Sequence, residues 1–412
     1  MSRGKRVQRR SGGSRMVPVL LLALLAVAAA GLVWLRNRPE EPAPPAEEPL
    51  PPPAESPEPE PPPDPAELLL AEMTLHEKVC QLFIVFPSDL TGESPVTMAG
   101  ETTQAALEAY PVGGLIYDRT NLVSREQART MLETTQSYAK IPLILTCDEE
   151  GGRVNRLMGT IGTTYIGPML NYADQGPEKA AENAKTIAED LRSVGFNMDL
   201  APVADVWSNP ANTVIGDRAY SRDFTQAGEL VAAAVEGFHS GGAACVLKHF
   251  PGHGDTAADS HYGAVYVPKT LDQLREEELV PFRAGIAAGA DAVMMGHLIV
   301  QDADSQPAPF SYRLVTELLR QELGFDGVVM TDSLQMQAMT DHYTGAETAV
   351  KAVQAGVDLL LCPRDLREAV QALTEAVDSG EIPLERVDES VLRVLRLKLN
   401  QGILEAPPEG DH

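Results

Sequence analysis

The sequence is short of aromatic residues, of cysteines and of positive charge. Aromatic side chains make up 5% of its 412 residues, and 33 Lys and Arg face 59 Asp and Glu, for a formal net charge of −26. A chain this acidic lacks the basic surface that phosphate backbones require, so we expect no nucleic acid partner. The four cysteines, Cys80, Cys147, Cys245 and Cys362, form no CxxC pair and lie in apolar runs. We therefore expect buried free thiols.

The first 66 residues lack the composition of a globular domain. Residues 1–16 carry six basic side chains and no acid, and residues 17–35 are uncharged and long enough to span a bilayer. Because basic flanks stay in the cytoplasm, this pattern predicts a single-pass membrane anchor with an extracytoplasmic domain. A cleaved signal peptide and a secreted protein are the alternative. Residues 36–66 are mostly Pro, Glu and Ala, which predicts a disordered linker.

Residues 67–405 predict one large α/β domain. Eight apolar runs alternate with amphipathic helical stretches, which is typical of a parallel sheet covered on both faces. Eight such runs favour a single closed (β/α)8 barrel of the TIM type, with an open doubly wound sheet as the alternative. The runs begin at Cys80, Gly113, Pro142, Asn197, Ala243, Asp291, Gly327 and Asp358.

Polar side chains stand where several of these runs end. In a parallel barrel the carboxyl ends of the strands meet at one mouth, where the connecting loops build the active site. The sequence therefore predicts a shared site there. Its strand-end candidates are Asp148, Asp205, Lys248, His249, His297 and Asp332.

The segment KHFPGHGDTAADSH, residues 248–261, is the most specific feature. Asp259 and His261 lie two residues apart, so in an extended segment their side chains share a face. A carboxylate in that position can orient an imidazole and tune it for proton transfer near neutral pH.

This segment resembles the β-N-acetylglucosaminidase branch of glycoside hydrolase family 3, whose signature is K-H-[FI]-P-G-H-G-x4-D-S-H. Every fixed position matches, from Lys248 to His261. Further similarity covers CDEEGGRVNRL from Cys147, APVADV from Ala201, IGDRAYS from Ile215 and GFDGVVMTDSLQM from Gly324. The resemblance extends over about residues 68–400.

The resemblance implies an exo-acting, retaining β-N-acetylhexosaminidase that removes terminal N-acetylglucosamine from peptidoglycan fragments through a covalent glycosyl-enzyme. Retention requires an attacking carboxylate and a proton donor. It implies no metal and no other cofactor, and nothing in the sequence argues for assembly beyond a monomer. The implied roles are Asp332 as nucleophile, His261 as general acid/base assisted by Asp259, and Asp148, Arg156, Arg218, Lys248 and His249 as sugar-binding residues.

Several alternatives stay open. A histidine acid/base could accept phosphate in the second step, which would make the chain a glycoside phosphorylase, and a non-catalytic cell-wall binding module is a further alternative. Arg156 and Arg218 could form structural ion pairs. His249, His253 and His261 could together ligate zinc, although no HExxH motif supports this.

Two details concern individual acids. Ser333 follows Asp332, where many relatives carry a second acid, which puts the tuning of the Asp332 pKa in doubt. We interpret Glu150 as a residue that braces its loop.

Overall fold

The chain divides into two compact units, residues 1–61 and 62–412. The computed structural model describes residues 17–39, 64–256, 263 and 265–406. In the first unit it describes the helix α1 (Val17–Arg36). Across the described residues, no helix combines the length and the apolarity that crossing a membrane requires.

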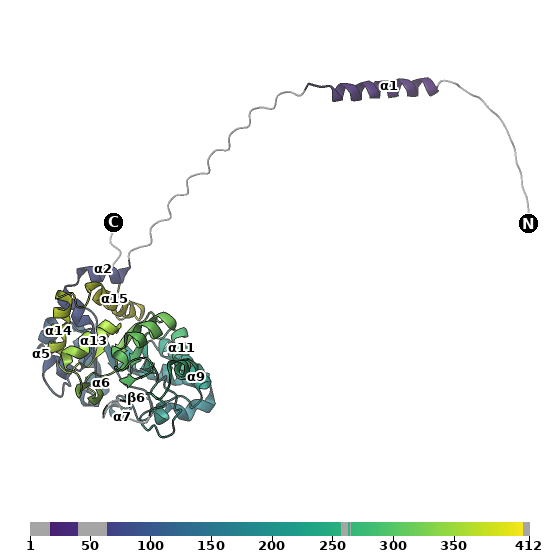
Figure 1. Cartoon of the computed structure of the whole chain (residues 1–412). Coiled ribbons are helices and arrows are strands. Elements are labelled where there is room, and N and C mark those ends of the chain that lie inside the picture. The colour runs from purple at the N-terminus through teal and green to yellow at the C-terminus, as the bar shows by residue number, and fades with distance from the viewer. Residues whose placement is uncertain (1–16, 40–63, 257–262, 264, 407–412) are drawn as a thin grey trace, which may run out of the picture. The chain divides into compact units, whose positions relative to one another are not determined.

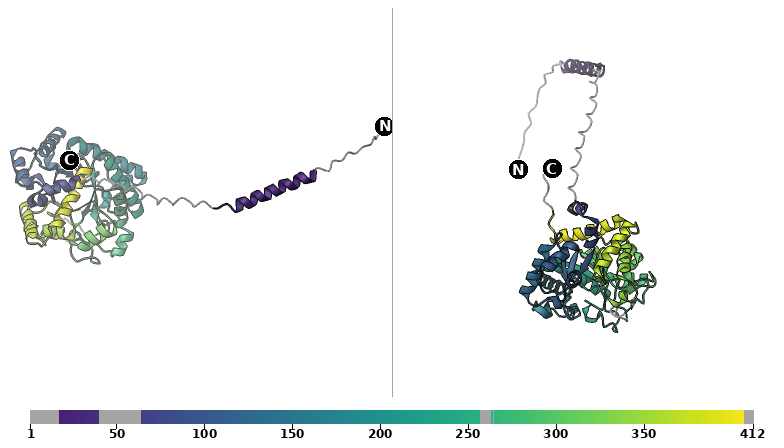
Figure 2. Two further views of the ribbon diagram at one scale, coloured as in Figure 1. Left: turned by 90° about the horizontal axis from the view of Figure 1, so that it is seen from above. Right: turned by 90° about the vertical axis from the view of Figure 1, so that its left-hand side faces the viewer.

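The second unit is built around an eight-stranded parallel sheet (Figures 1 and 2). Its strands are β1 (Phe83–Val85), β2 (Gly114–Ile116), β3 (Ile144–Cys147), β4 (Met198–Asp199), β5 (Ala244–Phe250), β7 (Ala292–Met295), β9 (Val328–Thr331) and β10 (Leu360–Leu361). The order is β10-β1-β2-β3-β4-β5-β7-β9, and a parallel bridge between Met330 and Leu359 joins the two outer strands. The result is a nearly closed parallel barrel, consistent with the TIM type. Each strand lies within one predicted apolar run, so the α/β class is confirmed.

Helices cover the outside of the barrel, and in the left view of Figure 2 their colours follow one another around the ring in sequence order. The α-helices are α2 (Pro65–Glu72), α3 (Leu75–Gln81), α4 (Pro87–Thr91), α5 (Glu101–Ala109), α6 (Arg125–Tyr138), α7 (Met158–Ile161), α8 (Pro177–Val194), α9 (Phe224–Ser240), α10 (Leu271–Glu276), α11 (Leu279–Ala287), α12 (Gln337–Thr340), α13 (Gly345–Ala355), α14 (Leu366–Asp378) and α15 (Leu384–Asn400).

Short elements complete the domain. The helices η1 (Arg119–Asn121), η2 (Met169–Gln175), η3 (Gly216–Arg218) and η4 (Ala308–Phe310) are of the 3-10 type, and η5 (Arg313–Glu322) is a π-helix. Two further strands, β6 (Val265–Tyr266) and β8 (Leu298–Ile299), pair in parallel as a separate small sheet.

Helix starts follow local sequence signals. Thr74 and Thr344 each accept a bond from the N–H three residues later, and Glu77 and Glu347 bond back to the capping residue. Such a capping box satisfies N–H groups that the first helical turn leaves unpaired. It therefore fixes where α3 and α13 begin.

Alternate residues of each strand face opposite sides of the barrel wall. In β5, Ala244 and Val246 belong to the core inside the barrel, while the intervening side chains belong to the core under the helices. Continuing this alternation, Lys248 faces the interior at the carboxyl end of the strand. The same parity brings Asp148 and Asp332 inward beyond β3 and β9. The alternation thus positions the predicted site residues.

A buried carboxylate, Asp358, lies at the opposite end of the barrel, just before β10. It accepts hydrogen bonds from Ser390 at 2.7 Å, from Arg386 and Arg393 at 3.3 Å each, and from Arg320. These partners lie on α15 and η5, so one carboxylate ties both helices to the barrel wall.

Lys398 of α15 is fully buried near this end. Its ammonium nitrogen lies 2.7 Å from Oε1 of Gln81. Burial lowers the pKa of Lys398 from its ordinary 10.5 to about 7. Because the folded-state pKa is the lower one, the unfolded chain binds more protons between these two pH values, and stability rises with pH across this window.

Replacing this amine should remove that dependence. Lys398→Met has no amine to titrate, so its stability should lack this dependence on pH. Between pH 7 and pH 10, the free energy of unfolding of the wild type should therefore rise by about 3 kcal/mol more than that of the variant. Urea unfolding at several pH values measures the difference. Lys185→Met, at a lysine whose side chain is 51% exposed, serves as the control and should show no such divergence. Parallel curves for the wild type and Lys398→Met would contradict the assignment.

Candidate active site

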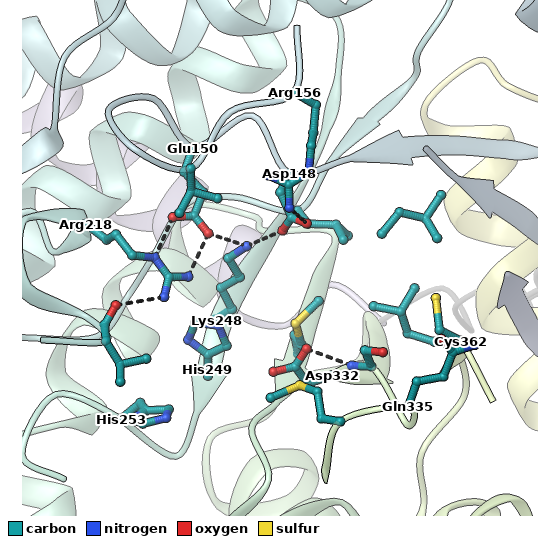
Figure 3. A pocket seen from close by; sticks show the side chains of 18 of the residues that line it. Asp148, Glu150, Arg156, Arg218, Lys248, His249, His253, Asp332, Gln335 and Cys362 are labelled. Carbon is teal, nitrogen blue, oxygen red and sulfur yellow. Dashed lines mark hydrogen bonds and ion pairs between the residues drawn. The ribbon is translucent and has the colours of Figure 1, made fainter. Parts of the chain in front are cut away.

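A cavity of about 580 Å³ opens at the carboxyl ends of the barrel strands (Figure 3). Ile116, Leu200 and Met294 line it and also belong to the core inside the barrel, so they form its apolar floor. The predicted site residues that line it are Asp148, Arg156, Arg218, Lys248, His249 and Asp332. The other two, Asp259 and His261, lie outside the described residues.

One wall of the cavity carries a chain of alternating charges, which we call the ion chain: Arg156, Asp148, Lys248, Glu150 and Arg218 (Figure 3). The Arg156 guanidinium lies 3.0 Å from Asp148, whose other oxygen is 2.7 Å from the Lys248 nitrogen. That nitrogen is also 2.6 Å from Glu150. Glu150 in turn accepts two bonds of 2.8 Å from Arg218. Three cations thus face two carboxylates along this wall.

The ion chain keeps Lys248 and Glu150 charged although both are buried. Burial alone would lower the pKa of Lys248, but the charges of Asp148 and Glu150 outweigh it and raise that pKa above its ordinary value. Burial likewise favours the neutral acid at Glu150, yet Arg218 and Lys248 hold the pKa of Glu150 far below its usual range. Each charge therefore depends on its neighbours. The structural ion pairs considered for Arg156 and Arg218 are present.

Two consecutive glutamates, Glu149 and Glu150, hold this wall of the cavity in place through different contacts. The buried Glu149 carboxylate accepts the N–H groups of Arg156, Leu157 and Met158 at 2.5, 2.7 and 3.0 Å. These bonds fold the loop back so that Arg156 reaches Asp148. Glu150 links this loop to η3 through Arg218, so it braces two loops rather than only its own.

Asp205 organises a second wall. Its buried carboxylate accepts Nδ1 of His249 at 2.7 Å and the N–H of His253 at 2.6 Å. Burial works to raise the pKa of Asp205, but the charge of His249 and its hydrogen bond outweigh this and lower it. An ionised carboxylate accepts only, so Nδ1 of His249 carries a proton. Asp205 was visible in the sequence as a strand-end acid but was assigned no role.

His253 is a lining residue that the sequence did not single out for substrate. Its Nε2 is buried and has no hydrogen-bond partner among the described residues, and burial lowers the pKa of the imidazole. Its ring stands edge-on to that of His249 with centroids 5.9 Å apart. Neither of the two belongs to the group of converging metal-ligating side chains found among the described residues, and His261 lies outside them.

Asp332 follows β9 and is half-buried in the cavity, where Ser333 N–H donates to Oδ1 at 2.7 Å. Burial acts to raise the pKa of Asp332, but the positive charges of His249 and His297 and the Ser333 N–H outweigh it. The pKa therefore lies below its ordinary value, without an acid at position 333. An ionised carboxylate is thus held at the cavity wall opposite the ion chain (Figure 3).

The loop that leaves β5 can follow its path only with glycine. A Cβ at Gly254 would stand 1.6 Å from the Val206 carbonyl oxygen, and one at Gly252 would stand 2.5 Å from Cγ of Glu278. Gly252 also has a φ of +123°, which disfavours other residues. This close approach explains both glycines of the PGHG sequence.

Comparison with known proteins assigns the family. Residues 74–397 match the sequence profile of the glycosyl hydrolase family 3 N terminal domain. The chain is 33% identical over 322 residues to beta-hexosaminidase A of Pseudoalteromonas piscicida, which covers 71% of this chain and 54% of that protein. It thus spans about half the length of that relative. Beta-hexosaminidase LpqI of Mycobacterium tuberculosis is 35% identical, with 80% of this chain and 84% of that protein covered.

Comparison with solved structures points to the same family. The fold is similar to that of a family 3 beta-N-acetylglucosaminidase from Paenibacillus sp. FPU-7, with a TM-score of 0.76, 39% identity and coverage of 80% of this chain and 63% of that one. The structure of LpqI of M. tuberculosis gives a TM-score of 0.73 at 34% identity, covering 81% of this chain and 96% of that one. With the family profile spanning the whole barrel, the chain belongs to glycoside hydrolase family 3.

Proposed function

We propose that this chain is an exo-acting β-N-acetylhexosaminidase that hydrolyses terminal β-linked N-acetylglucosamine from peptidoglycan fragments. The observation that supports this most directly is the ionised Asp332 facing a wall of fixed charges in one cavity. The names of relatives that align over most of their own length point to the same activity. The closed apolar floor suits a chain end rather than a strand passing through, which favours exo action.

The proposed reaction is a double displacement. Asp332 attacks the anomeric carbon and forms a covalent glycosyl-enzyme, which water then hydrolyses with overall retention. Attack requires the ionised carboxylate, and the lowered pKa of Asp332 supplies it at neutral pH. His261 gives a proton to the leaving oxygen and later takes one from water, with Asp259 orienting its ring. These two roles rest on the sequence signature.

The sugar hydroxyls are the proposed ligands of the ion chain and of His249. Asp148 accepts from hydroxyl groups, and Arg156, Arg218 and Lys248 donate to them. Because the ion pairs already fix these side chains, binding a sugar costs little further ordering. Glu150 touches no substrate in this scheme and acts as a positioning residue.

The catalytic roles predict distinct losses of turnover. Asp332→Asn should lower kcat/KM on 4-nitrophenyl β-N-acetylglucosaminide by about 10³-fold or more, because no nucleophile remains. His261→Ala should lose about 10²–10⁴-fold on a disaccharide. It should lose less on the nitrophenyl substrate, whose leaving group needs no proton. Proton NMR of the first product should show the β-anomer.

The exposed residues Asp174 and His342 provide matched controls. Asp174→Asn and His342→Ala should keep wild-type turnover. An Asp332→Asn enzyme that stays active would remove the nucleophile assignment, and a first-formed α-anomer would exclude retention. If added phosphate gave sugar 1-phosphate in place of free sugar, the chain would be a phosphorylase.

The positioning role of Glu150 is also testable. Glu150→Gln leaves Arg218 and Lys248 short of one buried negative charge, which should destabilise the fold by about 3 kcal/mol. We expect KM to rise more than kcat falls, because the sugar-binding side chains lose their fixed positions. Glu182→Gln, which breaks a surface pair of 2.8 Å with Lys179, is the control and should cost under about 1 kcal/mol with unchanged kinetics. Equal changes in stability and in KM for the two variants would argue against a positioning role for Glu150.

We further propose a single (β/α)8 domain tethered outside the cytoplasm by residues 17–35 through the linker 36–66. The support is the basic, acid-free stretch 1–16 followed by the uncharged run. Secretion after cleavage within that run is the alternative.

Fractionation of producing bacterial cells tests this topology. The full chain should sediment with membranes, and external protease should degrade it in spheroplasts. A chain lacking residues 1–35 should stay inside the cell and resist the protease. Activity in the medium with a trimmed N-terminus would indicate cleavage, and protection of the full chain from protease would contradict export.

A further inference from the structure

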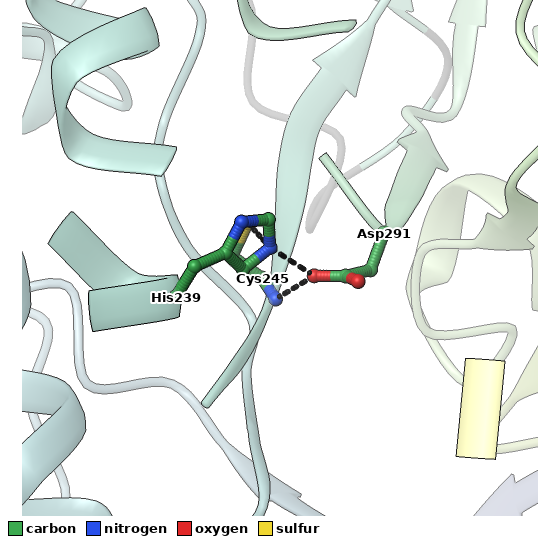
Figure 4. A group of neighbouring side chains, drawn as sticks. All are labelled: His239, Cys245 and Asp291. Carbon is green, nitrogen blue, oxygen red and sulfur yellow. Dashed lines mark hydrogen bonds and ion pairs between the residues drawn. The ribbon is translucent and has the colours of Figure 1, made fainter. Parts of the chain in front are cut away.

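Three side chains that can ligate a metal meet at the end of the barrel opposite the cavity (Figure 4). His239 lies near the end of α9, Cys245 is the second residue of β5, and Asp291 directly precedes β7. They come from three elements, and Cys245 faces the helices rather than the barrel interior. The active site uses none of them.

Their distances approach those of a tetrahedral zinc site. Nε2 of His239 is 2.8 Å from Oδ2 of Asp291 and 4.0 Å from Sγ of Cys245, and all three ligand atoms lie within 4.8 Å of one another. With bonds of about 2.0–2.3 Å, tetrahedral zinc needs about 3.4 Å between nitrogen and oxygen and about 3.6 Å between nitrogen and sulfur. Each of the two distances from the His239 nitrogen would therefore have to change by about half an ångström, and the sulfur would have to move toward the carboxylate until it too is within bonding distance of the ion.

The Asp291 carboxylate has few positive partners. Its side chain is only 10% exposed, and within residues 64–256 and 265–406 its one ion-pair partner is His239. Arg393 and Arg396 line the neighbouring cavity, but both are paired with other carboxylates. A carboxylate this little exposed is stabilised by a positive partner, which a protonated imidazole or a bound cation can supply.

Outer contacts hold the carboxylate in place. The amide of Gln401 donates to Oδ1 of Asp291 at 2.5 Å, and the backbone N–H of Cys245 donates to Oδ2 at 2.9 Å. Hydrogen bonds of this kind orient the carboxylates of metal sites and raise their affinity.

The site has an entry path. Asp291 lines a cavity of about 290 Å³ together with Gly289 and Asn400, and the His239 side chain is 31% exposed. Three protein ligands next to solvent leave the fourth position of a tetrahedral ion to water.

We propose that His239, Cys245 and Asp291 bind one Zn²⁺ ion, with a water molecule as fourth ligand. The thiol proton and any imidazole proton pass to solvent when the three bonds to zinc form, since the ligands are thiolate and neutral imidazole. The ion ties α9 to the amino ends of β5 and β7. Because β5 carries Lys248 and His249 at its other end, the ion stabilises the strand that holds the catalytic wall and takes no part in the chemistry.

Equilibrium dialysis of the metal-stripped full chain against Zn²⁺, followed by metal analysis, tests this. We expect one equivalent to be retained, and a melting temperature that rises with zinc. Cys245→Ser and Asp291→Asn should each weaken binding at least about 10-fold. Co²⁺ as a probe should give a thiolate charge-transfer band that disappears in Cys245→Ser.

Two other thiols serve as controls. Cys362 lines the cavity, and Cys80 lies 3.6 Å from His76 with no third ligand beside them in the part of the chain that the structure describes. Cys362→Ser and Cys80→Ser should retain zinc. Binding that survives Cys245→Ser, or that Cys362→Ser abolishes, would place the ion elsewhere and overturn the proposal, as would the absence of stoichiometric zinc.

Should Cys245→Ser fail to fold, His239→Gln gives the same test at a more exposed side chain. It keeps a hydrogen-bond donor for Asp291 but provides no imidazole. Unchanged zinc affinity in a folded His239→Gln chain would equally overturn the proposal. None of these measurements depends on hydrolase turnover. The zinc site and the proposed activity are therefore tested independently of each other.

Discussion

The buried ammonium group of Lys248 is the charge around which the catalytic cavity is arranged. Removing an ammonium from water costs several kcal/mol unless carboxylates replace its hydration. Asp148 and Glu150 do so at 2.7 and 2.6 Å, and each of them needs a further cation in turn. Arg156 and Arg218 meet that need from two different loops. One buried charge therefore constrains the placement of four other side chains, and with them the shape of the cavity wall that we propose faces the sugar.

Asp332 stands outside this network, which suits a nucleophile. A carboxylate locked into an ion pair would have to break it before attacking carbon. Within the described residues, Asp332 instead receives one backbone N–H bond and the longer-range field of neighbouring imidazoles and of Lys248. Its pKa stays low although it belongs to no ion pair among the described residues. Ser333 follows Asp332, and the histidines together with its N–H are sufficient to keep Asp332 ionised.

The two ends of β5 illustrate how one strand serves two purposes. Its inward-facing residues run from Ala244 through Val246 to Lys248, from packed core to catalytic wall. Its outward face begins with Cys245, beside His239 and Asp291. Fixing the amino end of the strand against α9 and β7 limits how far the carboxyl end can shift. A site remote from the cavity can thus stabilise the geometry within it.

The sequence by itself determined the α/β class, the eight strand positions and six of the cavity residues, because apolar runs and strand-end polar residues are local signals that side-chain alternation converts into position. It did not assign Asp205 or His253, and it interpreted Glu150 from its own loop alone. Those residues act through partners 44 to 98 positions away in the chain, as Asp205 does with His249 and Glu150 with Lys248. Only tertiary folding brings such partners together, because burial and neighbouring charge are properties of the packed barrel and not of any segment.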